Sequence, residues 1–68
     1  MSDIPDSVLD ALEAVRASGH VNMYDREGVI FLAEMDGDFD AADWLQQATP
    51  ARYMAALQAM GARRASPP

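Results

Sequence analysis

The stretch HVNMYDREGVIFLAEM, residues 20–35, decides the fold because it is compatible with two different structures. As a helix over residues 25–36, it has Asp25 as its N-cap and Gly37 as its stop. The apolar residues at helical spacing on the inner face of that helix are Val29, Leu32 and Ala33.

The same stretch also has the character of a β-hairpin. Its strands are then residues 20–24 and 29–35, joined by a turn at residues 25–28. The run VIFLA has the β-branched and aromatic content that is typical of a strand. The pattern by itself leaves helix and hairpin evenly matched.

The segments on either side are typical of short helices. Residues 4–18 end at Gly19, which can adopt the left-handed conformation, and Ser2 or Asp3 is the expected cap. A third helix is expected from Asp38 and a fourth from Thr49, a hydroxyl cap followed by proline. The expected inner faces are Ile4, Val8, Leu12 and Val15 in the first helix, Phe39, Ala42 and Leu45 with Trp44 adjoining in the third, and Tyr53, Ala56, Leu57 and Met60 in the fourth.

Thirteen alanines in 68 residues favour an all-helical fold, because alanine is the best helix former and allows helices to approach closely. We predict an all-α, compact bundle of about four short helices, with an α+β fold carrying a hairpin at residues 20–35 as the alternative. A chain of 7.4 kDa is expected to form a single domain over residues 1–68. Loose termini are expected at residues 1–3 and 65–68.

Charge is distributed unevenly along the chain. Eleven acidic residues oppose five arginines, the net charge is −6, and there is no lysine. Residues 1–47 contain all the acids with two arginines, whereas residues 48–68 contain three arginines and no acid. Such a surface repels a phosphate backbone, so direct binding to nucleic acid is not expected. It favours solubility, or a partner protein with a basic surface.

Few residues have the chemistry of a catalytic or metal site. The chain has no cysteine, and His20 is its single imidazole. The alternating acids Asp36, Asp38 and Asp40 resemble the start of a calcium loop, but the later glycine and glutamate of an EF-hand are missing. We therefore expect Asp38 and Asp40 to cap the third helix and to complement its dipole. The sequence predicts no enzyme, no cofactor and no metal.

Large side chains are scarce, so we expect most of the aromatic residues in the core, with Met23 and Tyr24 turned inward. Tryptophan and tyrosine also anchor protein interfaces, and Trp44 is a candidate for either role. Arg63 and Arg64 are expected to complement the dipole of the last helix. The five aromatic residues are Tyr24, Phe31, Phe39, Trp44 and Tyr53.

The run GHVNMYD at residues 19–25, followed by Val29, Ala33, a short acidic break, Ala42, Trp44-Leu45 and Tyr53, resembles an uncharacterised family of short phage and prophage proteins. That family's pattern is a first helix ending in glycine, an Asn-Met-aromatic-Asp turn, and three further short helices. The resemblance covers residues 4–61 and implies a helix over residues 25–36. It carries no established activity.

As a class, small acidic phage proteins without cysteine resemble inhibitors that occupy the nucleic-acid groove of a host enzyme, including anti-CRISPR and anti-restriction proteins. The resemblance thus implies a cytoplasmic, phage-derived inhibitor of a host nucleic-acid-handling or defence complex, docking an acidic surface on a basic groove. The alternative is a helical dimerisation or adaptor module, structural or regulatory, without mimicry of nucleic acid. No membrane partner is expected. The predicted contact residues are Glu34, Asp36, Asp38, Asp40, Asp43 and Trp44.

Overall fold

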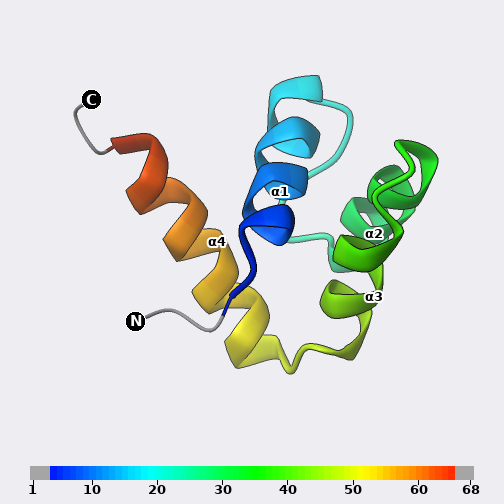
Figure 1. Ribbon diagram of the computed structural model, residues 1–68. Helices are drawn as coiled ribbons and strands as arrows, with labels where there is room; N and C mark the ends of the chain where they lie inside the picture. The colour runs from blue at the N-terminus through cyan, green and yellow to red at the C-terminus, as the bar shows by residue number, and fades with distance from the viewer. Residues whose placement is uncertain (1–3, 66–68) are drawn as a thin grey trace.

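The computed structural model describes residues 4–65, and these form four helices and no strand. The helices are α1 (Asp6–Ser18), α2 (Arg26–Met35), α3 (Phe39–Gln47) and α4 (Pro50–Ala65). Helix α1 contacts the other three and lies between α4 and the hairpin formed by α2 and α3 (Figure 1). The all-α prediction is confirmed, and the β-hairpin considered for residues 20–35 is wrong.

The helix boundaries follow local signals in the sequence. Helix α1 ends at Gly19, whose φ of 70° is left-handed, and Gly37 with a φ of 83° makes the turn after α2. The Asp25 carboxylate accepts a hydrogen bond from the Gly28 N–H at 3.3 Å, so it caps α2 as predicted. The Thr49 hydroxyl accepts one from the Arg52 N–H at 3.2 Å and caps α4.

Two expected caps differ in the structure. Pro5 is the N-cap of α1, and its carbonyl accepts hydrogen bonds from the N–H groups of Val8 and Leu9. The expected caps Ser2 and Asp3 lie outside the described residues, as do residues 1–3 and 66–68 of the expected loose termini. Ala65, which was also expected to be loose, is the last residue of α4. Asp38 is the N-cap of α3, but its carboxylate makes no capping hydrogen bond. Its N–H donates to the Ala33 carbonyl at 2.9 Å, so the end of α2 fixes its backbone.

The core is built around the apolar stripe of α1, where Leu12 is fully buried and faces the equally buried Leu45 and Val29 of the hairpin. Alanine supplies much of the remaining buried surface, which lets short helices approach closely with few large side chains. The predicted inner faces of the first and fourth helices are confirmed. The buried alanines are Ala11, Ala33, Ala41, Ala42, Ala48 and Ala56.

The expectation that most aromatic residues lie in the core is wrong. Tyr53 is buried and Trp44 is half-buried, but Tyr24 is 73%, Phe39 67% and Phe31 59% exposed. Helix α3 turns Ala41, Ala42 and Leu45 toward the core, and Phe39 at its first position falls outside that arc. Met23 is half-buried against the core as expected, whereas its neighbour Tyr24 points into solvent.

Helix α4 is held to the other elements by polar contacts made by its side chains and by Arg26. The Tyr53 hydroxyl donates to the Met23 carbonyl, and the Arg26 guanidinium donates to the Ala48 carbonyl just before α4. Arg63 was expected to act on the dipole of its own helix. In the structure it pairs with Asp10, at 2.6 Å, and with Glu13, because α4 runs alongside α1.

Candidate protein-docking surface

The five predicted acidic contact residues all lie on the α2–α3 hairpin and all are exposed. Glu34 is in the last turn of α2, and Asp36 and Asp38 belong to the turn that joins the two helices. Asp40 is in the first turn of α3, and Asp43 follows one turn later. We call this set, together with Glu27 at the start of α2, the acidic face.

The carboxylates of the acidic face form no ion pair with any residue in the described part of the chain. Asp43 alone has a polar side-chain contact, accepting a hydrogen bond from the Gln47 amide at 3.1 Å. On α1, by contrast, Asp10 and Glu13 share Arg63. The hairpin therefore presents negative charge that no other described residue neutralises.

Glu34 lies in the last turn of α2, a position at which negative charge is unfavourable. The carbonyl end of a helix carries a partial negative charge, which favours Lys, Arg or His in the last turn. Helix α2 has no basic residue in its last turn and has Glu34 there, with Asp36 as its C-cap. Asp38 and Asp40, at the positive end of α3, have a structural reason for their charge, but Glu34 has none within the fold.

Exposed apolar side chains lie among these carboxylates. Phe31 and Met35 are one turn apart on the outer surface of α2, and Met35 is 70% exposed. Phe39 follows directly after the turn at residues 36–38 and is also exposed. Aromatic and methionine side chains are enriched in the buried centres of protein interfaces, and lone carboxylates are not.

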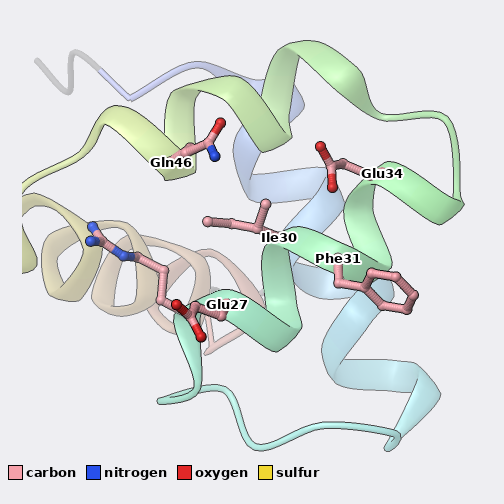
Figure 2. Close-up of a pocket in the computed structure, with 6 residues that line it drawn as sticks. Glu27, Ile30, Phe31, Glu34 and Gln46 are labelled. Carbon is pink, nitrogen blue, oxygen red and sulfur yellow. The ribbon is translucent and has the colours of Figure 1, made fainter.

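A shallow hollow of about 380 Å³ lies between the outer surface of α2 and the end of α3 (Figure 2). Ile30 projects into it between Gln46 of α3 and Glu27 of α2, while Glu34 borders its other end. Phe31 also lines the hollow, and its ring is directed away from Ile30 and Gln46 (Figure 2). The acidic face therefore includes an apolar concavity with polar groups around its rim.

Trp44 lies away from the acid-rich turn. Its side chain is half-buried against the core, and the Arg52 guanidinium carbon lies 5.3 Å from the centre of its ring. That distance is typical of a cation–π contact, which here joins α3 to α4. Trp44 thus makes a structural contact that leaves only part of its ring available to a partner.

The described residues contain no group of three or more His, Asp or Glu side chains placed to hold a metal ion. Over the same range, no helix combines the length and apolar character needed to cross a bilayer. No protein-family model, curated protein or solved structure matches this chain. What the surface can do is therefore argued from its own geometry.

The sequence analysis did not select Glu27, Ile30, Phe31 or Met35 as contact residues. The signal was present, because Glu27, Phe31 and Met35 are spaced four residues apart and share one side of any helix over 26–35. This spacing was not interpreted as a contact surface, because the large side chains of so small a domain were expected to lie in its core.

Proposed function

We propose that this chain is a protein-binding module that docks its acidic face on a basic surface of a partner protein. The observation that carries the proposal is the set of exposed carboxylates without partners within the described residues, interspersed with exposed Phe31, Met35 and Phe39. Charge of one sign steers a partner of the other sign, and apolar side chains at the contact supply affinity.

The finer form of the proposal is a phage-derived inhibitor of a host nucleic-acid-handling or defence complex. A groove that binds nucleic acid presents arginine and lysine to phosphate, and carboxylates compete for the same groups. The resemblance of residues 4–61 to short phage proteins supports this form. Two of the three arginines of residues 48–68 are compatible with it, since Arg63 is paired with α1 and Arg52 stacks on Trp44.

The test compares partner capture by three forms of the full chain. In one variant Asp36, Asp38, Asp40 and Asp43 become Asn, and in the matched control the same four residues become Glu, which keeps the charge. We expect the natural chain and the Glu variant to retain, from a bacterial host lysate, a nucleic-acid-binding protein that salt or added duplex DNA releases. The Asn variant should retain little of it. Equal retention by the Asn variant at every salt concentration would contradict the proposal.

A second candidate function is a dimerisation or adaptor module. It is favoured by Tyr24 and Met54, exposed side chains that border a hollow of about 230 Å³ together with Pro50. This surface adjoins the start of α4 and is separate from the acidic face. The dimer predicts a solution mass of twice 7.4 kDa by sedimentation equilibrium, unaffected by the four Asn substitutions.

A further inference from the structure

The outer surface of α2 carries an ordered arrangement of charge and apolar groups. Glu27 and Glu34 are seven residues apart, which is two helical turns, so they lie nearly in line and about 10 Å apart along the axis. By helical geometry Ile30 lies on one side of this line and Phe31 and Met35 lie on the other, and both Ile30 and Phe31 line the hollow. Each carboxylate is thus flanked by apolar surface.

This surface has no partner within the described residues. The core side of α2 is formed by Val29 and Ala33, which are fully buried. The side-chain carboxylates of Glu27 and Glu34 make no hydrogen bond or ion pair with another described residue. At one end of the hollow the Arg26 guanidinium is directed to the Ala48 carbonyl and does not bridge to either glutamate.

A second copy of the chain is poorly suited to cover it. The basic residues of α4 whose side chains the structure describes are Arg52 and Arg63. Arg63 is held by Asp10 and Glu13, and Arg52 stacks on Trp44. Arg16 is exposed at the end of α1, but one arginine cannot pair with two glutamates that lie two turns apart, so a different protein suits this surface better.

We propose that α2 binds a basic amphipathic helix of the partner, with two arginines in i and i+7 positions that pair with Glu27 and Glu34. The inference rests on the proposed function and names the kind of segment that the partner offers. Two helices lying side by side have the same rise per residue, so charges two turns apart on both of them stay in register. An apolar residue midway between the arginines packs on Ile30 and Phe31.

Arginine suits this surface better than lysine, whose ammonium is a compact charge. Its guanidinium donates to a carboxylate through two parallel N–H groups, and its aliphatic stem covers neighbouring apolar surface. Here that surface is provided by Ile30 and Phe31, which both line the hollow and flank the two carboxylates. The Gln46 side-chain amide at the edge of the hollow adds a neutral acceptor.

The test uses two synthetic peptides of about 15 residues, long enough for alanine-rich sequences to become helical. Both contain two arginines and one leucine in an alanine background, with equal length and charge. In the first the arginines are at i and i+7, on one side of the helix, and in the second at i and i+5, on different sides. Binding to the isotope-labelled full chain is followed by amide chemical shifts and by fluorescence anisotropy of the labelled peptide.

We expect the i, i+7 peptide to bind about fivefold more tightly, because only it can form both exposed charge pairs at once. Its shifts should be concentrated on α2 and around Gln46. The variant E27Q/E34Q should remove this preference, whereas D36N/D40N, which loses the same charge elsewhere on the hairpin, should weaken both peptides and keep their ratio. All the substituted side chains are exposed, and circular dichroism verifies that the variants stay helical.

Equal binding of the two peptides, binding of neither up to millimolar concentration, or a preference that survives in E27Q/E34Q would overturn the inference. The proposed function is tested separately by the four Asn substitutions, which leave Glu27 and Glu34 in place. If those substitutions abolish capture of a partner while the peptides are not discriminated, the acidic face binds but does not recognise a helix in this register.

Discussion

The Tyr53 hydroxyl is a part-buried polar group that helps to position α4. It donates to the carbonyl of Met23 in the α1–α2 loop and so ties α4 to a segment 30 residues earlier in the chain. Burial raises the pKa of Tyr53 to about 12 from its ordinary value of 10.0, with nearby Arg26 lowering it and Asp25 raising it by smaller amounts. The neutral phenol is therefore the form that the fold requires.

This raised pKa predicts a specific loss of stability in alkali. Below pH 10 the phenol is neutral in both states, so its stabilisation is fully present. Between about pH 10 and 12 only the unfolded chain loses the proton, and the free energy of unfolding should fall by about 2 kcal/mol. Urea denaturation at several pH values measures it. In Y53F this fall should disappear, whereas Y24F, which removes an exposed phenol, should retain it.

The two glutamates of α2 allow the effect of a carboxylate on the free energy of unfolding to be compared between the two ends of one helix. Glu27 is in the first turn, where the helix dipole favours a carboxylate, and Glu34 is in the last turn, where it does not. E27Q should lower the free energy of unfolding by about 0.5 kcal/mol, and E34Q should raise it by a similar amount. Chemical denaturation at low salt separates them. Destabilisation by E34Q would show that Glu34 has a role in the fold that its contacts do not reveal.

At the scale of the elements, α4 depends on a contact near each of its ends, with Tyr53 close to the first and Arg63 close to the second. Arg63 bridges Asp10 and Glu13 across the groove between α4 and α1. Replacing it by Gln leaves both carboxylates without their cation and should open the last turns of α4. The readout is faster amide hydrogen exchange over residues 57–63, with residues 51–55 unchanged.

The matched control for that experiment is Arg16→Gln, which removes one positive charge from the exposed end of α1. It should leave exchange in α4 unaltered. If both substitutions accelerate exchange equally, the effect reflects net charge and not the specific bridge.

The helices were predictable because their ends are marked locally. Gly19, Asp25, Gly37 and Thr49 each act within three residues of the boundary that they set, so one short window of sequence contains the whole signal. The choice between helix and hairpin at residues 20–35 was different. Its pattern was even, so the residues alone did not favour the helix that the structure has.

The contacts that shape the candidate surface were not predictable in the same way. Arg63 meets residues about 50 positions away, and Tyr53 meets a carbonyl 30 positions away, so neither partner can be read from neighbouring sequence. Phe39 was assigned inward because Ala42 and Leu45 follow at helical spacing. In a nine-residue helix an alternative arc through Ala41 and Leu45 fits equally well, and packing against α1 and α2 selects it.

Over the whole molecule, the uneven distribution of charge has opposite effects on stability and on binding. Seven carboxylates and one arginine lie within residues 25–47, whereas the ion pairs of Arg63 with Asp10 and Glu13 join α1 to α4. Like charges on one hairpin repel each other in the folded state. At 0.1 M salt this repulsion is largely screened between charges more than about 10 Å apart. The same screening weakens attraction to a basic partner.

We therefore expect salt to have opposite effects on folding and on binding. Raising the ionic strength from about 0.01 M to about 0.15 M should raise the melting temperature of the isolated chain by a few degrees and should weaken capture of the partner. The variant with Asn at Asp36, Asp38, Asp40 and Asp43 should melt higher at low salt, because the Asp38 carboxylate makes no capping hydrogen bond to lose and the relief of repulsion exceeds the lost dipole interaction of Asp38 and Asp40. The Glu variant should behave as the natural chain. If the Asn variant instead melts lower at low salt, these carboxylates stabilise the hairpin, and their charge needs no partner to explain it.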